Sequence, residues 1–219
     1  MQLIRFATHG VAKSRWWAFH HLYHGMASTY DAVASLVSLG RWRAWVSVVL
    51  PFLAGPRILE IGYGTGHLMA NLSADRAIRA VGLDESRQMA RLARRRVALR
   101  VPLLRGMAQR LPFCAESFET VVSTFPSEYI SDTHTVSEIY RVLAPGGRLV
   151  ILPLARIVGD RRPWRATARL LAFLMHLASG TQEQAVLSLG KTLSDLGFQV
   201  STQHVQLPLS VVVVVQAIK

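Results

Sequence analysis

The stretch Ile58-Leu59-Glu60-Ile61-Gly62-Tyr63-Gly64-Thr65-Gly66 decides how this chain folds. Its first half belongs to a short apolar run, residues 57–61, which is typical of a buried strand. Three glycines at alternating positions follow, and glycine lets the backbone turn tightly and approach a ligand because it has no Cβ atom. A strand that leads into such a turn predicts a ligand site at the carboxyl edge of an open α/β sheet.

The chain on either side of this stretch alternates between strand and helix patterns. Val136, Ile139, Tyr140 and Leu143 recur at spacings of three and four residues, which indicates an amphipathic helix that ends at the Pro-Gly-Gly after it. Strands that alternate with helices favour a parallel, doubly wound sheet. The expected strands are 57–61, 78–83, 101–104, 119–123 and 148–154, with helices after 66 and from Ser86 to Val97.

The C-terminal part adds a helix at about 182–196 and two further strands, 198–205 and 211–218. A short turn around Pro208 joins these strands, so they form an antiparallel hairpin. We therefore expect an α/β fold with a seven-stranded sheet, helices on both faces and an antiparallel C-terminal hairpin.

The composition restricts the class of protein. The chain has 219 residues, 51% of them apolar, 17% charged and only one a cysteine, Cys114. These values exclude a disordered chain, a disulfide framework and a cysteine-based zinc site. The net charge of +12 favours anionic partners such as nucleic acid, anionic lipid or acidic small molecules.

The membrane and targeting signals point to a cytoplasmic protein. No stretch approaches the roughly 20 consecutive apolar residues that a transmembrane helix needs, and the first twenty residues lack the continuous apolar segment of a secretory signal.

Two segments lie outside the alternating pattern. Residues 1–56 form an N-terminal helical extension, with helices expected at about 28–39 and 41–50. In its cluster of His20, His21 and His24, a helix would place His20 and His24 on one face, but no third zinc ligand is evident, so no metal site is expected. Residues 158–180 form a basic amphipathic insertion around Trp164. Such a helix either lies in a membrane interface, on the inner membrane face, or packs over the substrate pocket.

The spacing of the glycines restricts the class of ligand that the loop can bind. A dinucleotide fingerprint has the spacing G-x-G-x-x-G, whereas this chain has G-x-G-x-G with Glu60 two residues before the first glycine. Asp84 ends the second strand, where a carboxylate can accept hydrogen bonds from both ribose hydroxyls. An NAD site has the same acid, so Asp84 alone does not identify the ligand. The glycine spacing, Glu60 and the terminal hairpin together argue against an NAD site.

Five ordered blocks carry a family resemblance: residues 59–66, 82–84, 106–113, 117–123 and 138–147. With them the chain resembles the class I S-adenosylmethionine (SAM)-dependent methyltransferases, and it is similar to the ubiquinone/menaquinone-biosynthesis C-methyltransferases (methyltransferase type 11). The resemblance covers about residues 28–157. It implies a Rossmann-like methyltransferase domain over 57–219, with the extension 1–56 as a cover for SAM and substrate.

The resemblance also implies the site. Asp84 would hold the ribose, Glu60 would lie at the methionine amino end, and the Ala108 N–H would face the adenine. One position departs from the family, because an acid that bonds the adenine amino group usually stands where this chain has Met107. This departure predicts weaker or less selective adenine recognition. The full set of expected SAM-binding residues is Tyr30, Glu60, Gly62, Tyr63, Gly64, Gly66, Asp84, Met107, Ala108, Gln109, Ser123 and Thr124.

The sulfonium of SAM is already a good methyl donor, so alignment of the acceptor should dominate catalysis. Alignment lowers a barrier by about 7–11 kcal/mol, whereas a general base contributes about 3–5 kcal/mol. If a base exists, Glu128, Tyr129 and His134 are the candidates, since they follow the fourth strand at the ligand edge. The alternative is that all three are ordinary polar loop residues.

The leading hypothesis is methyl transfer to a small or lipophilic acceptor, at the surface of an anionic membrane. An RNA-directed enzyme is the second, although Ser123-Thr124-Phe125-Pro126 replaces the Asn/Asp-Pro-Pro-aromatic motif of amino-directed nucleic-acid methyltransferases. A SAM-binding protein without catalysis is the third. The acceptor atom and the oligomeric state stay open.

Overall fold

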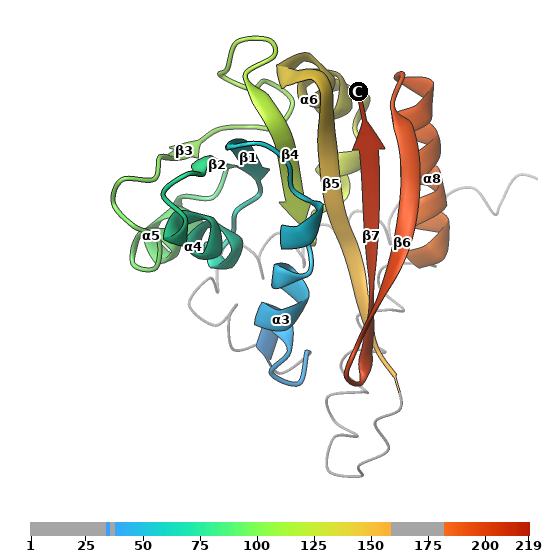
Figure 1. The fold of residues 1–219 in the computed structure, drawn as a ribbon, viewed down its shortest axis with the longest axis horizontal. Coiled ribbons are helices and arrows are strands. Elements are labelled where there is room, and N and C mark those ends of the chain that lie inside the picture. Colours follow the sequence, from blue (N-terminus) through green and yellow to red (C-terminus); the bar gives the residue numbers. More distant parts are fainter. Residues whose placement is uncertain (1–33, 36–37, 159–181) are drawn as a thin grey trace, which may run out of the picture.

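The computed structural model describes residues 34–35, 38–158 and 182–219. These residues form one seven-stranded sheet with the order β3-β2-β1-β4-β5-β7-β6 (Figure 1). The strands are β1 (Arg57–Ile61), β2 (Arg79–Asp84), β3 (Leu103–Arg105), β4 (Phe118–Thr124), β5 (Leu143–Ile157), β6 (Gln199–Leu207) and β7 (Ser210–Ile218).

The strand directions confirm the predicted topology. Strands β1 to β5 pair in parallel, while β7 pairs antiparallel with both β5 and β6. Strand β7 therefore lies between β5 and β6, and the hairpin closes the sheet on that side. Because β1 is central and β2 and β4 flank it, the carboxyl ends of these three strands meet at one edge.

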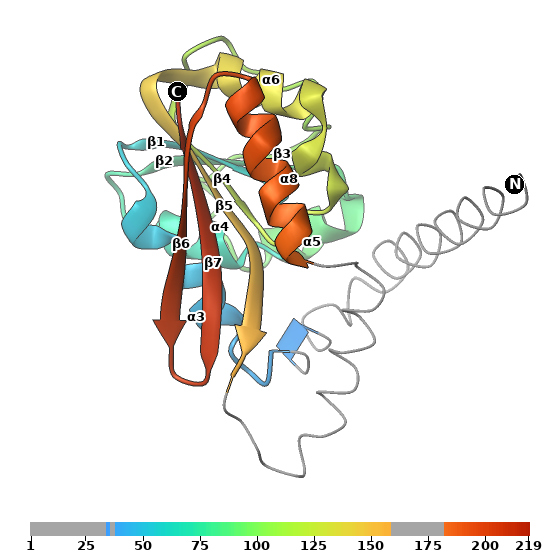
Figure 2. The ribbon, with the colours of Figure 1, turned by 90° about the vertical axis from the view of Figure 1, so that its right-hand side faces the viewer.

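Helices cover both faces of the sheet, as expected (Figure 2). Helices α6 and α8 pack on the face to which Leu59 and Ile61 point. Helices α3, α4 and α5 cover the opposite face, against Ile58 and Val122. The helices of the described residues are α3 (Trp42–Ser47), α4 (His67–Ala74), α5 (Arg87–Arg94), α6 (Thr133–Val142) and α8 (Gln182–Asp195), with short 3₁₀ helices η1 (Leu50–Phe52) and η2 (Glu128–Ser131).

Local capping explains where two of the helices begin. The Ser86 hydroxyl accepts a hydrogen bond from the Met89 N–H at the start of α5, as predicted from the sequence. The Asp132 carboxylate accepts one from the His134 N–H at the start of α6. Each cap satisfies a backbone donor that has no partner within its helix.

Three helix ends differ from the prediction. The helix expected at 41–50 ends at Ser47, and Pro51 lies in the separate 3₁₀ turn η1, where its missing N–H costs nothing. Helix α5 ends at Arg94 instead of Val97. Helix α6 ends at Val142, because Leu143 is already extended and pairs with Phe118 before the Pro-Gly-Gly turn.

Several predictions fall outside the described residues. They concern most of the N-terminal extension, Tyr30, the histidine cluster at 20–24 and nearly all of the basic insertion at 158–180. In the part of the chain that is described, no helix is both long and apolar enough to cross a bilayer.

Candidate functional site

The glycine loop after β1 is shaped by backbone conformation. Gly62 and Gly64 have φ angles of +73° and +51°, a region that L side chains rarely adopt. A Cβ atom on Gly62 would lie 2.4 Å from the Tyr129 hydroxyl oxygen, whereas one on Gly64 would meet nothing within 4 Å. Gly62 is therefore required by close packing, and Gly64 leaves open space beside its backbone where a ligand can approach.

Asp84 faces this loop from the end of β2. Its Oδ2 atom accepts a hydrogen bond from the Gly64 N–H at 2.8 Å, and its Oδ1 atom accepts one from the Ser86 N–H at 2.8 Å. The side chain is buried. A carboxylate has about four acceptor sites, and two of those of Asp84 hold the glycine loop and the start of α5. The structure places it where a ribose-binding acid is expected.

Glu60 is a buried acid in β1, only 1% exposed. Its Oε2 atom has no hydrogen-bond partner among the described residues. Burial, followed by the nearby Asp84 charge, raises the pKa of Glu60 well above its ordinary value, and a hydrogen bond from the backbone of Met69 opposes this only in part. A buried carboxyl group with one unpartnered oxygen is suited to receive a cationic or hydrogen-bond-donating ligand group.

A small cavity of about 30 Å³ lies between the glycine loop, α3 and the end of β4. Trp42 of α3 reaches it and stacks on Phe125 with ring centroids 4.4 Å apart. Phe125 has a φ angle of +49°, an outlier for a bulky residue and a kind of strain that clusters at functional sites. The lining residues are Trp42, Val46, Glu60, Gly62, Tyr63, Gly64, Thr65, His67, Leu68 and Thr124.

A second, wider cavity of about 360 Å³ opens at the ends of β2 and β3. Glu85, Arg105, Gly106 and Met107 line it. Strand register places Asp84 opposite Arg105, so the residues that follow these two strands share one edge.

The other residues of the third block differ in their exposure. Met107 is 57% exposed, while Ala108 is buried. Gln109 is half-buried, and its side chain interacts with Asp132.

Ser123 and Tyr129 form one hydrogen-bond network below the glycine loop. The Ser123 hydroxyl donates to the Ile61 carbonyl at 2.7 Å and lies 2.8 Å from the Tyr129 hydroxyl, which also donates to the Ile61 carbonyl at 3.1 Å. Burial raises the pKa of the Tyr129 hydroxyl above its ordinary value. Tyr129 therefore stays protonated near neutral pH and supports the loop. Thr124, one residue beyond Ser123, lines the small cavity.

The three base candidates do not come together. Glu128 is exposed in η2, and the His134 side chain is 83% exposed, with Nδ1 3.4 Å from Asp132 Oδ1. Of the three, only Tyr129 touches the glycine loop, and none lines either cavity.

Tyr63 has a different role from the other expected loop residues. Its ring packs into the core below Gly82, and burial together with Asp84 raises its pKa to about 12. Its backbone belongs to the loop, but its side chain is only 3% exposed.

The structure also adds residues that sequence reasoning did not assign. Trp42, Thr65, Glu85 and Arg105 line the two cavities. Glu85 carried a usable signal, because it directly follows the strand-ending Asp84. Trp42 carried none, since its apolar spacing in the extension is equally typical of core packing. No group of three or more His, Cys, Asp or Glu that could hold a metal ion occurs within the residues described.

Comparison with known proteins agrees with this geometry. Residues 58–147 match a family model described as a methyltransferase domain. The chain is 34% identical over 148 residues to a demethylmenaquinone methyltransferase of Symbiobacterium thermophilum, covering 62% of this chain and 58% of the relative. It is 28% identical over 142 residues to the ubiquinone/menaquinone biosynthesis C-methyltransferase UbiE of Geotalea daltonii, covering 60% of each. The chain thus spans less than two thirds of the length of these relatives.

Solved structures show the same fold. A SAM-dependent methyltransferase of Thermotoga maritima superposes with a TM-score of 0.61 at 22% identity, covering 90% of this chain and 98% of the other. One from Aquifex aeolicus gives a TM-score of 0.60 at 18% identity, covering 86% and 97%. The family model and the sequence relatives, together with the five sequence blocks, show that residues 58–147 carry a methyltransferase domain that is similar to the ubiquinone/menaquinone C-methyltransferases.

Proposed function

We propose that this protein transfers a methyl group from SAM to a small lipophilic acceptor of the quinone type. The observation that carries the proposal is the pair of buried acids at the glycine loop, Asp84 bound to the Gly64 N–H and Glu60 with an unpartnered oxygen. SAM carries a ribose and an ammonium group, which are complementary to such acids. The names of the sequence relatives supply the acceptor class.

The residues present fit this cofactor. Asp84 would accept hydrogen bonds from the ribose, and the unpartnered carboxyl oxygen of Glu60 would receive the ammonium end. Gly62, Gly64 and the loop backbone would allow close approach. When bound, SAM supplies an electrophilic methyl group on a sulfonium.

The protein's own contribution is then mainly positioning. Trp42, Phe125 and Thr124 lie at the end of β4, beside the small cavity. The pKa of Tyr129 is raised and its hydroxyl is engaged with Ile61, so it acts as a support and not as a base. Alignment contributes about 7–11 kcal/mol and does not require a base, and an acceptor that is already ionised, such as a quinol anion, needs none.

Binding of S-adenosylhomocysteine, measured by calorimetry, tests the cofactor. Asp84→Asn removes the charge and should weaken binding about 10-fold to 100-fold, since a hydrogen bond to a charged group contributes about 1.5–3 kcal/mol. Asp75→Asn, at an exposed acid after α4, is the matched control and should bind normally. Equal binding by Asp84→Asn and wild type would contradict the proposal.

Methyl transfer to a reduced 1,4-naphthoquinone, followed by mass spectrometry, tests the acceptor. We expect a product heavier by one methylene unit together with S-adenosylhomocysteine. Cofactor binding without turnover on naphthoquinols or benzoquinols would refute the acceptor class and leave the cofactor site intact.

A further inference from the structure

The adenine end of the site presents a chemical problem. Met107 stands where the family resemblance calls for an acid, and its thioether is only a weak hydrogen-bond acceptor. The 6-amino group of adenine donates hydrogen bonds and needs an acceptor. Without a side-chain acceptor, the site would lose the hydrogen bond that reads this amino group.

The wide cavity at the ends of β2 and β3 contains a carboxylate, which is a hydrogen-bond acceptor. Among its four lining residues, Glu85, Arg105, Gly106 and Met107, one is an acid. Glu85 directly follows Asp84, and Met107 lies two residues after Arg105, which pairs with Asp84. The acid and the apolar side chain thus come from neighbouring strand ends, which lie about 4.8 Å apart in a sheet.

A hydrogen bond holds the backbone of Glu85 next to another residue that lines the same cavity. Arg105 Nη2 donates to the Glu85 carbonyl oxygen at 3.3 Å. This bond links the main chain of Glu85 to a neighbouring lining residue. The cavity volume of about 360 Å³ is within the range of small-ligand sites.

We propose that Glu85 is the specificity-determining residue for the adenine of the cofactor, and that its carboxylate accepts the 6-amino hydrogen bond that Met107 cannot. Met107 packs on the purine as an apolar contact. The inference rests on the proposed SAM site. It also reverses the expectation of weak adenine recognition that follows from Met107 alone.

The test compares two ligands that differ in one group. S-inosylhomocysteine carries a carbonyl oxygen in place of the 6-amino group, and that oxygen repels a carboxylate. Wild type should bind S-adenosylhomocysteine at least about 10-fold more tightly than S-inosylhomocysteine, because a hydrogen bond to a charged group contributes about 1.5–3 kcal/mol. Glu85→Gln should lose most of this preference, since an amide can donate as well as accept.

Met107→Asp provides the rescue. Added to Glu85→Gln, it should restore the preference for adenine, whereas on the wild-type background it should add little because the amino group is already paired. Glu116→Gln, at an exposed acid before β4, is the matched control and should leave both affinities unchanged.

The outcomes separate the two claims. Failure of wild type to bind S-adenosylhomocysteine would overturn the proposed function and this inference with it. Normal binding by wild type, with the adenine preference unchanged in Glu85→Gln, would overturn the role of Glu85 alone. Thermal denaturation of each variant verifies that it is folded.

Discussion

At the scale of single residues, Glu60 is the feature of the site that is least explained by stability. A carboxyl group at 1% exposure loses its hydration, and among the described residues the backbone of Met69 offsets that loss only in part. A protein selected for stability alone would carry an apolar residue there, on the same face of the sheet as Ile58. A buried acid at this position therefore points to a ligand that compensates for the burial.

The raised pKa of Glu60 predicts that the free energy of unfolding depends on pH. A folded-state pKa above the unfolded value favours folding at pH below the unfolded pKa of about 4.5, and this advantage is lost as pH rises towards the folded value. Glu60→Gln cannot ionise, so its free energy of unfolding relative to wild type should increase between pH 5 and pH 8. Each unit of pKa displacement corresponds to about 1.4 kcal/mol.

Urea denaturation at several pH values measures this effect. Glu119→Gln is the control, because Arg57 lowers the pKa of Glu119 and places its transition below pH 5. Its difference from wild type should be constant between pH 5 and pH 8. A constant difference for Glu60→Gln as well would show that Glu60 is ionised throughout.

The contact between Gly62 and Tyr129 predicts a coupled pair. Gly62→Ala places a methyl group 2.4 Å from the Tyr129 hydroxyl oxygen at a φ of +73°, and should destabilise the fold by more than about 1 kcal/mol. Tyr129→Phe removes that oxygen, so the double variant should be more stable than the sum of the two single effects. Denaturation of all four proteins gives the coupling energy, and strict additivity would refute the contact.

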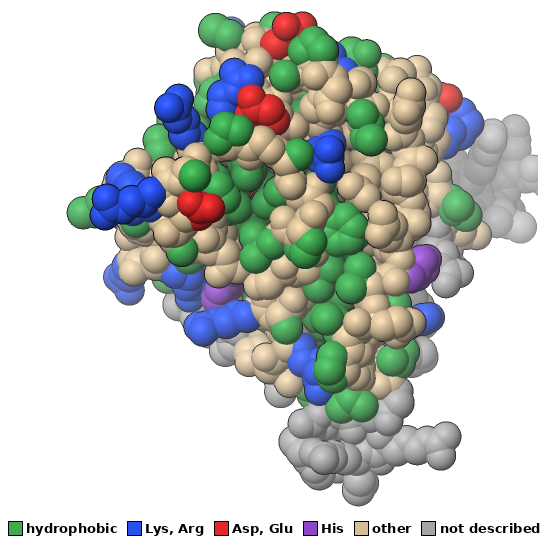
Figure 3. All heavy atoms as spheres, viewed as in Figure 1, with side chains coloured by type: hydrophobic (Ala, Val, Ile, Leu, Met, Phe, Trp, Pro, Cys, Tyr) green, Lys and Arg blue, Asp and Glu red, His purple; other side chains and the backbone are tan. Residues whose placement is uncertain are grey.

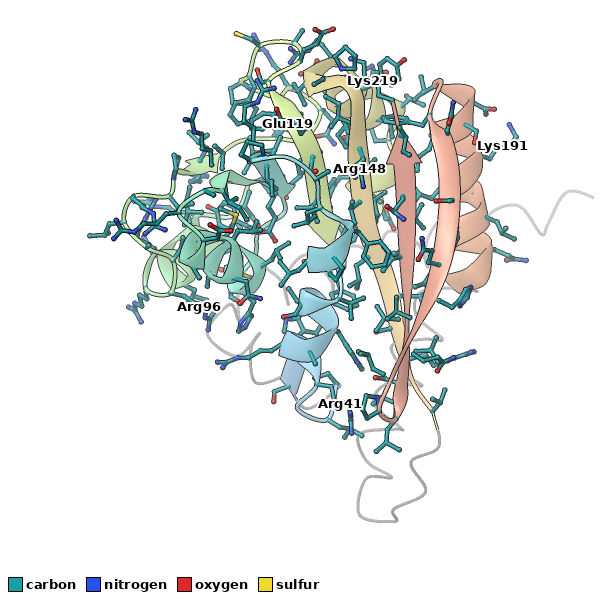
Figure 4. All side chains as sticks on the ribbon, viewed as in Figure 1. Arg41, Arg96, Glu119, Arg148, Lys191 and Lys219 are labelled. Carbon is teal, nitrogen blue, oxygen red and sulfur yellow. The ribbon has the colours of Figure 1, made fainter. Side chains whose placement is uncertain are left out.

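At the scale of elements, helix α3 connects the N-terminal part of the chain to the far end of the sheet. Trp45 Nε1 donates to the Ser210 hydroxyl oxygen at 3.0 Å, at the start of β7. The Arg41 guanidinium donates to the carbonyl of Pro208 in the β6–β7 turn, the end of the sheet where Figure 4 shows Arg41. These two contacts hold α3 in the position from which Trp42 reaches the small cavity.

Loosening this anchor should affect both stability and binding. Trp45→Phe keeps an aromatic ring but leaves the Ser210 hydroxyl without its donor, so we expect a loss of about 1–2 kcal/mol and a Tm lower by about 2–4 °C per kcal/mol. S-adenosylhomocysteine affinity should fall too, because Trp42 is held less firmly. Ser210→Ala removes the same bond, and the double variant should be no worse than Trp45→Phe; two additive losses would contradict the anchor.

At the scale of the whole molecule, charge is unevenly distributed. Basic side chains gather over α4 and α5, on the left of Figure 3. Arg87, Arg91 and Arg95 are exposed on or beside α5, and Leu99 after it is 87% exposed. Exposed arginines around an apolar side chain are complementary to the anionic surface of a bilayer, which is where a lipophilic acceptor would be found.

Docking of this basic face on an anionic bilayer, if it occurs, predicts charge-dependent vesicle binding. Protein should sediment with vesicles that contain phosphatidylglycerol and not with pure phosphatidylcholine, and added salt should release it. Arg91→Glu with Arg95→Glu should weaken binding by more than about 30-fold, at about 1 kcal/mol per basic residue removed. Arg43→Glu with Arg156→Glu, exposed on α3 and β5, is the control. Equal binding to neutral vesicles, or preferential salt-sensitive binding to RNA, would refute the docking of this face on an anionic bilayer.

The sequence alone determined the features whose signals lie within a few residues. The bounds of β1, the Ser86 cap, the antiparallel hairpin and the Gly62–Gly66 loop were predicted and observed, because periodicity, caps and glycine conformations are local properties. Asp84 was also placed at the loop, since every parallel strand end in such a fold reaches the same edge.

Only the tertiary structure decided which side chains meet. Trp42 reaches the cavity because α3 is anchored to residues more than 160 positions away, and Tyr129 becomes a support because its hydroxyl lies against Gly62. Glu85 and Met107 share a cavity because β2 and β3 are neighbours. Such contacts depend on how distant segments pack, and that information is distributed over the whole core and is absent from any short stretch of sequence.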